Sequence, residues 1–311
     1  MRRRKMLGVI ALFGALTLVA AACGEDETPG GDGTETGAPV AEGMCADVDT
    51  SAGDLLAEIC EGGTLRVATD QKYKPQSWYS AKDEQWMGFD VDVANEIANR
   101  LGVTAEINHQ DWEVITAGSW NARWDISVGS MTDTVPREEL FYFTPAYYFT
   151  PAGFAVHSSN TSIQDISTDL DGKKICVGVA TTYEDYLKGS LVLGETAPQF
   201  EFVVDDPQIV TFNTDTDALD QLALGDGVRC DAAMTATPTT QTYIDDGGPI
   251  KHVGEPAYYE PLSIALDQAS PVDNQSLVDA VSEIVDEMHQ DGTLTELSMK
   301  WYDADLTKTV T

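Results

Sequence analysis

The feature that most constrains the fold is a repeated alternation of strand-like apolar runs with helix-like amphipathic segments. GTLRVATD (63–70) has the composition of a buried strand that ends in a polar loop. GFDVDVANEIANRLGV follows, with Phe89, Val93, Ile97 and Leu101 four residues apart and a glycine at the end, which predicts an amphipathic helix. TAEINHQ, DWEVITAGSW and WDISVGSM then predict a strand, a helix and a strand. Such alternation favours a mainly parallel sheet with ligands at the carboxyl ends of its strands.

The alternation restarts further along the chain. KKICVGVA, FEFVV and VRCDAAMTA predict strands, and YEDYLKG and TDALDQLALG predict the helices between them. Two extended segments, GFAVHSS and IKHVGEPAYYEPLSIAL, connect this second unit to the rest. The closing segments SLVDAVSEIVDEMHQDG and LTELSMKWYDAD read as helices, and the first carries Leu277, Val281, Ile284, Val285 and Met288 on one face.

We therefore predict an α/β fold of two lobes, each with a mainly parallel sheet flanked by helices. The first lobe combines residues 45–156 and 257–311, and the second is formed by residues 157–256. Because two extended segments join the lobes, they predict a hinge of two strands.

The amino terminus has the pattern of an export signal. Residues 1–22 begin with four basic side chains, continue with an apolar run and end in three alanines before Cys23. This pattern is similar to that of a bacterial lipoprotein signal, in which the cysteine is acylated; an ordinary secretory signal is the alternative. Residues 23–44 are polar and rich in glycine and acids, which predicts a disordered tether. We expect an extracytoplasmic protein anchored to the cell membrane by an N-terminal lipid.

The remaining four cysteines suit an oxidising compartment. Three pairings are possible, and we favour Cys45 with Cys60 and Cys176 with Cys230, since the latter two lie near the starts of two predicted neighbouring strands. A zinc site is the competing interpretation, but no CxxC spacing occurs and the four histidines are scattered, so we expect no metal.

The charge balance excludes one class of partner. The chain has 18 basic and 52 acidic side chains, a formal net charge of −34. Nucleic-acid binding relies on neutralising phosphates with cations, so nucleic acid is not expected as a partner. The simplest interpretation of this charge is a solvated acidic surface that plays no part in ligand binding.

These segments together resemble the family of extracellular solute-binding proteins that serve polar amino-acid ABC importers. The resemblance runs from residue 63 to about 305 and rests on the segments above together with SVGSMTDTVPRE, FYFTPAYY and VGVATTYEDYLKG. It implies two α/β lobes that close over a small solute and pass it to a membrane permease. It also implies a monomer without a cofactor.

The resemblance gives Arg137 a role. Family members place an arginine here, after a Ser or Thr turn, to bind the carboxylate of the solute. A guanidinium suits that task because it is planar, always charged and matched to two carboxylate oxygens. Donors of Thr132 are expected to assist, and Ser130 could offer its carbonyl or hydroxyl. The alternative is that Arg137 pairs with a surface acid such as Glu138.

Other positions follow from the same resemblance. Tyr73 and Trp112 match aromatic rings above and below the solute, although core packing would also explain either one. Asp70 matches a residue that contacts the far end of the solute in some relatives, or it is simply a turn or cap aspartate. Thr181 and Thr182 match a loop that donates backbone N–H groups to the carboxylate, but this loop is shorter here and lacks the usual glycine.

A further departure concerns the amino group of the solute. Receptors for α-amino acids in this family carry an aspartate where this chain has Ala236. A buried ammonium without an acceptor is unfavourable, so either Glu184 or Asp70 substitutes, or the solute has no free α-amino group. We favour the latter, for example a carboxylate that carries a delocalised or quaternary cation.

The predicted function is capture of a small carboxylate-bearing solute, an amino acid or a derivative, for an ABC importer. The alternative is an enzyme on the same fold, similar to cyclohexadienyl dehydratase, with Glu184 or His109 as the acid or base. Neither lies in a recognisable catalytic motif, so we expect no enzyme. A sensor domain would normally be joined to a membrane span or a signalling domain, and we identify neither in the sequence.

Overall fold

The computed structural model describes residues 43–195 and 197–308, so the signal, Cys23 and nearly all of the tether lie outside the described residues. Its helices are η1 (Met44–Asp47), α1 (Leu55–Gly62), α2 (Phe89–Leu101), α3 (Trp112–Thr116), α4 (Val135–Glu138), α5 (Thr182–Leu187), α6 (Asp215–Leu222), α7 (Thr237–Asp245), α8 (Gln275–Gln290) and α9 (Thr293–Tyr302). Its strands are β1 (Thr64–Thr69), β2 (Lys72–Tyr73), β3 (Ser77–Ser80), β4 (Gln85–Met87), β5 (Thr104–His109), β6 (Ile126–Thr132), β7 (Phe141–Phe143), β8 (Tyr148–His157), β9 (Lys174–Gly178), β10 (Gln208–Phe212), β11 (Ala232–Ala236) and β12 (Ile250–Asp267).

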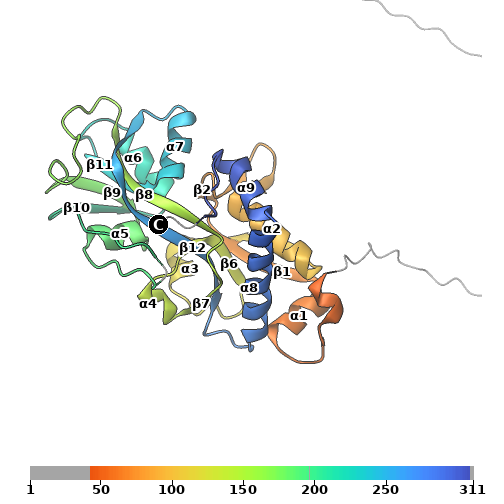
Figure 1. Cartoon of the computed structure of the whole chain (residues 1–311). Coiled ribbons are helices and arrows are strands. Elements are labelled where there is room, and N and C mark those ends of the chain that lie inside the picture. The colour runs from red at the N-terminus through yellow and green to blue at the C-terminus, as the bar shows by residue number, and fades with distance from the viewer. Residues whose placement is uncertain (1–42, 196, 309–311) are drawn as a thin grey trace, which may run out of the picture. The chain divides into compact units, whose positions relative to one another are not determined.

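The larger sheet has the strand order β10-β9-β11-β8-β12-β6-β1-β5, with β7 paired to β12. Strands β1, β5 and β6 pair in parallel at one end of this order, and β9, β10 and β11 pair in parallel at the other. These two parallel sets are the centres of two lobes. The long strands β8 and β12 pair antiparallel to each other and connect the two sets (Figure 1). The fold is thus the predicted two-lobed α/β fold with a two-strand hinge.

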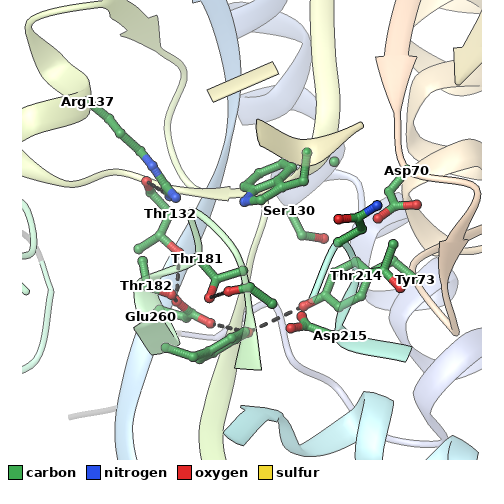
Figure 2. Close-up of a pocket in the computed structure, with 15 residues that line it drawn as sticks. Asp70, Tyr73, Ser130, Thr132, Arg137, Thr181, Thr182, Thr214, Asp215 and Glu260 are labelled. Carbon is green, nitrogen blue, oxygen red and sulfur yellow. Dashed lines mark hydrogen bonds between the residues drawn. The ribbon is translucent and has the colours of Figure 1, made fainter. Parts of the chain in front are cut away.

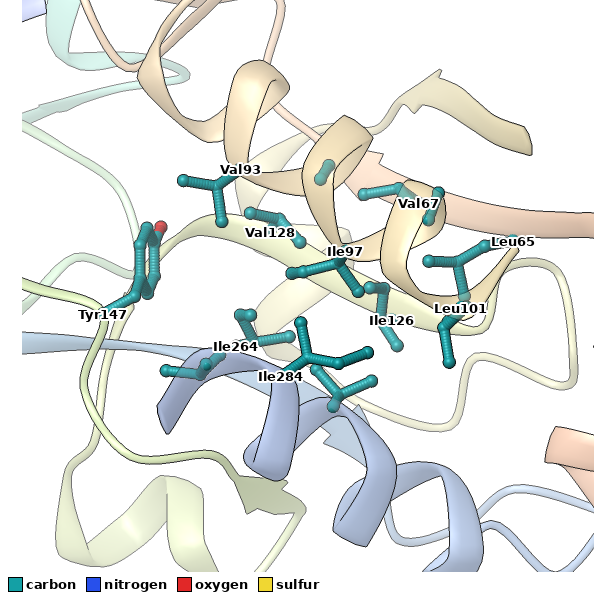
Figure 3. Packing of buried hydrophobic residues seen from close by; sticks show 14 of the residues in the cluster. Leu65, Val67, Val93, Ile97, Leu101, Ile126, Val128, Tyr147, Ile264 and Ile284 are labelled. Carbon is teal, nitrogen blue, oxygen red and sulfur yellow. The ribbon is translucent and has the colours of Figure 1, made fainter. Parts of the chain in front are cut away.

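The first lobe has its own core between helices α2 and α8 and the strands β1, β6 and β12. The four residues predicted for one face of α2 and the five predicted for α8 are all buried. Ile97 of α2 and Ile284 of α8 lie close together over Ile126 of the sheet (Figure 3). Burying each such side chain contributes about 1.5–3 kcal/mol, so this cluster holds the carboxyl-terminal helices against the amino-terminal half of the lobe.

The second lobe is built around two smaller clusters on β9 and β11. One cluster contains the disulfide of Cys176 and Cys230, and the other contains Tyr183, Tyr186 and Tyr258. The other disulfide joins Cys45 to Cys60.

One predicted strand, FEFVV (200–204), is wrong. This segment has no strand pairing, and the strand of this part of the lobe is β10, at Gln208–Phe212. The hydroxyl of Tyr186 donates to Glu201 O and accepts from Val203 N, while the ring of Phe200 lies 5.4 Å from that of Tyr258. The aromatic side chains that suggested a strand therefore pack individually against other rings, and a side chain rather than a neighbouring strand satisfies the backbone.

The described residues contain no helix that is both long and apolar enough to cross a membrane. In the same residues no group of three or more His, Cys, Asp or Glu side chains is arranged to hold a metal ion.

Candidate functional site

A pocket lies where the two lobes meet, at the carboxyl ends of β1, β6 and β9. All eight candidate ligand-binding residues from the sequence line it: Asp70, Tyr73, Trp112, Ser130, Thr132, Arg137, Thr181 and Thr182. Gly129, Gly178, Tyr183, Asn213, Thr214, Asp215 and Glu260 complete the lining.

Arg137 lies at one end of the pocket (Figure 2). It follows the N-cap Thr134 in the short helix α4, and only 8% of its surface is exposed. Its Nη1 donates to Thr132 O at 3.1 Å and its Nη2 donates to Ala180 O at 2.9 Å. None of the ion pairs among the described residues involves Arg137, which excludes the alternative of pairing with Glu138.

Burial lowers the pKa of Arg137, but a guanidinium stays charged at neutral pH. Carbonyl oxygens use two of its five N–H groups, which leaves donors for another acceptor. A buried cation without an ion pair is unfavourable, so this position favours an anionic ligand.

Trp112 and Ala180 fix the position of the guanidinium. The Cζ of Arg137 is 5.5 Å from the centroid of the Trp112 ring, within the range of a cation–π interaction. Trp112 Nε1 donates at 3.1 Å to Ala180 O, the same carbonyl that accepts from Arg137. Ala180 has a φ of +58°, a left-handed backbone that is uncommon outside glycine. The loop that lacks the usual glycine therefore still adopts the backbone that glycine favours, and its carbonyl contacts two first-lobe side chains.

Two residues that the sequence assigned as donors are largely engaged with the protein. The hydroxyl of Thr132 donates to Glu260 Oε2 at 2.6 Å. The hydroxyl of Ser130 contacts Asp90 Oδ2 at 2.8 Å and the hydroxyl of Tyr148 at 2.6 Å, in the interior of the first lobe. The N–H of Ser130 also donates to the hydroxyl of Tyr147 at 3.0 Å, so both its hydroxyl and its N–H are used inside the protein.

In the loop of Thr181 and Thr182, too, the side-chain hydroxyl groups form hydrogen bonds within the protein. Thr181 Oγ1 donates to Gly178 O at 2.7 Å and accepts from Glu184 N, which makes it the N-cap of α5. Thr182 Oγ1 donates to Glu260 Oε2 at 2.7 Å. With both hydroxyls engaged, any contact from this loop to a solute would use its backbone N–H groups.

Glu260 is a pocket residue that the sequence reasoning missed. It lies on the hinge strand β12 and has no exposed surface. Thr132 and Thr182 donate to its Oε2, and Tyr183 donates to its Oε1 at 2.7 Å. Burial raises its pKa. An acid within the apolar segment YYEPLSIAL was the signal available, because acids are rarely buried without a specific reason.

Asp215 is another pocket residue that the sequence reasoning missed, and it lies beside Tyr73 and away from Arg137 (Figure 2). It is the first residue of α6, and 7% of its surface is exposed. Burial raises its pKa to about 7, and burial likewise raises the pKa of Asp70 to about 6. The hydroxyl of Tyr73 lies 3.3 Å from that of Tyr183, across the pocket from the first lobe to the second.

The two candidates for an enzymatic acid or base do not line the pocket. Glu184 Oε2 accepts from Ala180 N at 2.7 Å and its Oε1 pairs with Lys188 at 2.8 Å. His109 lies 3.6 Å from Asp111. Ala236 is fully buried in the second-lobe core and also lies outside the lining. Glu184 therefore does not replace the aspartate that is absent there.

The chain is similar to bacterial solute-binding proteins. The family model described as "Bacterial extracellular solute-binding proteins, family 3" matches residues 65–304. The L-cystine-binding protein TcyJ of Escherichia coli (strain K12) is 28% identical, over 82% of this chain and 88% of TcyJ. The L-cystine-binding protein TcyA of Bacillus subtilis (strain 168) is 25% identical, over 82% of this chain and 87% of TcyA.

A solved structure of an amino acid-binding protein has the same fold as this chain. The crystal structure of the ancestral amino acid-binding protein AncCDT-1, described as a precursor of cyclohexadienyl dehydratase, superposes with a TM-score of 0.66. It is 29% identical and covers 79% of this chain and 99% of its own.

Proposed function

Because the chain belongs to family 3 of the bacterial extracellular solute-binding proteins, we propose that Arg137 binds the carboxylate of the solute that the protein delivers to its ABC importer. The observation that carries this proposal is a buried guanidinium on the pocket wall whose partners among the described residues are two backbone carbonyls. A solute carboxylate would give Arg137 a direct ion-pair partner through two parallel N–H···O bonds.

The other candidate residues have supporting roles in this proposal. Tyr73 and Trp112 provide aromatic walls, and Asp70, Ser130 and the loop of Thr181 and Thr182 provide polar groups from both lobes. Since a solute that touches both lobes binds the closed form better, binding shifts the hinge equilibrium toward closure.

The lobe boundaries and the anchor are part of the same proposal. Residues 45–156 and 257–311 form the first lobe and residues 157–256 the second, with the division inside β8 and β12. The protein acts as a monomer held at the membrane by lipid on Cys23. It is a receptor and not an enzyme, in keeping with Glu184 and His109 lying outside the pocket lining.

A thermal-shift screen of residues 45–311 tests the function. The panel contains α-amino acids, cystine, opines, betaines and ectoines, each with and without its carboxylate where the analogue exists. A ligand at a hundred times its dissociation constant should stabilise the protein by about 2.7 kcal/mol. Stabilisation by the carboxylate form alone is the expected result, and equal stabilisation by the two forms would contradict the role of Arg137.

A further inference from the structure

Asp90 is a buried acid that the proposed function does not use. It lies in the first turn of α2 and has no exposed surface. None of the ion pairs among the described residues includes it. A fully buried aspartate without a cationic partner is uncommon and unfavourable, so its presence calls for a specific reason.

The hydrogen bonds of Asp90 lead to the wall of the pocket. Its Oδ2 accepts from the hydroxyl of Ser130 at 2.8 Å, and its Oδ1 accepts from the hydroxyl of Tyr147 at 2.7 Å. The hydroxyl of Tyr147 in turn accepts from Ser130 N at 3.0 Å. The hydroxyl of Tyr148 lies 2.6 Å from that of Ser130 as well. Asp90 therefore holds Ser130 at two points, directly at its hydroxyl and through Tyr147 at its N–H.

The backbone of Ser130 explains why it needs such support. Its φ is +55°, a left-handed conformation that is unfavourable for a residue with a Cβ atom. It lies in β6, where the pairing with β12 shifts register between Ser127 and Met131, so that three residues of β6 lie opposite one residue of β12. Ser130 is the last of these three. Bulges of this kind redirect the chain beside functional sites.

The bulge of β6 forms part of the pocket. Gly129 and Ser130 both line it. A Cβ atom at Gly129 would lie 3.6 Å from Cζ3 of Trp112, so the bulge also lies against this aromatic wall. Because the Trp112 ring lies 5.5 Å from the Cζ of Arg137, a shift of the bulge would alter the surroundings of the guanidinium.

We propose that Asp90 is a positioning residue for solute binding, which holds Ser130 in the left-handed backbone that shapes this wall of the pocket. Asp90 is not among the residues that line the pocket, so it acts through Ser130 and Tyr147. A wall that is fixed before the solute arrives does not have to be ordered on binding, which raises affinity. This inference rests on the proposed function, because the position of the bulge affects affinity only if a solute binds in this pocket.

Two replacements of Ser130 separate its backbone from its hydroxyl. Ser130→Ala and Ser130→Gly both remove the hydroxyl, but only glycine adopts a left-handed backbone freely. The probes are L-cystine, L-arginine and L-glutamine, measured by titration calorimetry at pH 8. Asp90→Ala should weaken the tightest of them about tenfold, because a left-handed backbone disfavours a residue with a Cβ atom by about that factor.

Adding Ser130→Gly to Asp90→Ala should recover at least fivefold of this loss, whereas adding Ser130→Ala should recover none. A loss below threefold in Asp90→Ala, or equal affinities of the two double variants, would overturn the inference. If Asp90→Ala does not fold, Tyr147→Phe replaces it, because it removes the hydroxyl that joins Asp90 to Ser130 N. The same recovery by glycine and not by alanine is then expected.

Asp92→Ala is the matched control for Asp90→Ala. Asp92 lies in the same turn of α2, and its Oδ2 accepts from Lys300 Nζ and from Trp301 Nε1 at 2.6 Å, away from the pocket lining. Its replacement should lower the thermal stability and change the affinity less than threefold. A loss of affinity equal to that of Asp90→Ala would show that any lost acid in this turn has the same effect, and it would overturn the inference.

Amide hydrogen exchange tests the same positioning without a solute. Asp90→Ala should speed exchange of the Ser130 N–H at least tenfold relative to that of Ile97 within α2, and an unchanged ratio would overturn the inference. Arg137→Ala should leave this ratio unchanged and still weaken binding, so the two proposals have separate readouts. Failure of all three probes to bind the unaltered chain would count against the proposed function, and the exchange ratio would still decide whether Asp90 holds Ser130.

Discussion

Replacing Arg137 with alanine is the perturbation whose effect the structure defines best. The guanidinium is buried, is positioned by two carbonyls and by the Trp112 ring, and retains N–H groups for a ligand. A charge-assisted hydrogen bond contributes about 1.5–3 kcal/mol, so two such bonds to a carboxylate contribute about 3–6 kcal/mol. At about 1.4 kcal/mol per factor of ten, Arg137→Ala should weaken binding at least a hundredfold.

Isothermal titration calorimetry with the solute identified in the screen measures this change. Arg137→Lys should be intermediate, because lysine keeps the charge but cannot form two parallel hydrogen bonds with a carboxylate. Thermal unfolding without ligand should change by only a few degrees, since loss of an unpaired buried cation offsets the loss of two hydrogen bonds.

Arg123→Ala is the matched control for the Arg137 variant. Arg123 is exposed and also lies over a tryptophan, with its Cζ 4.5 Å from the Trp124 ring, but it is remote from the pocket lining. Its replacement should leave affinity unchanged. A loss below threefold in Arg137→Ala would refute the reasoning, because it would mean that the solute carboxylate does not use the guanidinium.

Three further outcomes follow from the described contacts. Binding of a cationic solute should weaken as the pH falls from 8 to 5, since burial raises the pKa of Asp215 to about 7 and of Asp70 to about 6 and protons then compete with the solute; a flat calorimetric profile would contradict this. Replacing Cys176 and Cys230 together with alanine should lower the free energy of unfolding by about 4 kcal/mol, because the pair closes a loop with a sequence separation of 54, and a loss below 1 kcal/mol in urea unfolding would be inconsistent with a structural bond. Ile284→Ala should cost about 2–5 kcal/mol with an unchanged urea m-value, since the side chain is fully buried between α8 and α2, and a cost below 1 kcal/mol would argue against that packing.

The fold was largely predictable because its signals are local and repeated. The four-residue spacing from Phe89 to Leu101 defines one buried helix face, and the glycines after the helices mark where several of them end. The strand predicted for FEFVV was wrong because alternating apolar residues cannot show whether a neighbouring strand is available to pair with them. There the hydroxyl of Tyr186 takes the place of a strand.

The lining of the candidate pocket was predictable where a motif marked it and not elsewhere. Arg137 stands in a recognisable segment, and the pocket lining includes it together with the other seven candidates. Asp215 gave no separate signal, since Asp215 and Asp217 both read as ordinary acids at the start of a helix. Only the fold shows that the first faces the pocket while the second pairs with Lys72 at 3.2 Å. The role of Glu260 could not be predicted either, because its hydroxyl donors come from positions 132, 182 and 183, far from it in the sequence.

The carbonyl of Ala180 has a consequence for how this protein is studied. It accepts hydrogen bonds from Trp112 and Arg137, so a main-chain oxygen joins the two lobes at this point. Alanine scanning is blind to this contact, because the residue is already alanine and its methyl group takes no part. A backbone ester in place of the amide after residue 180, which weakens the carbonyl as an acceptor, would reveal how much this single oxygen favours closure.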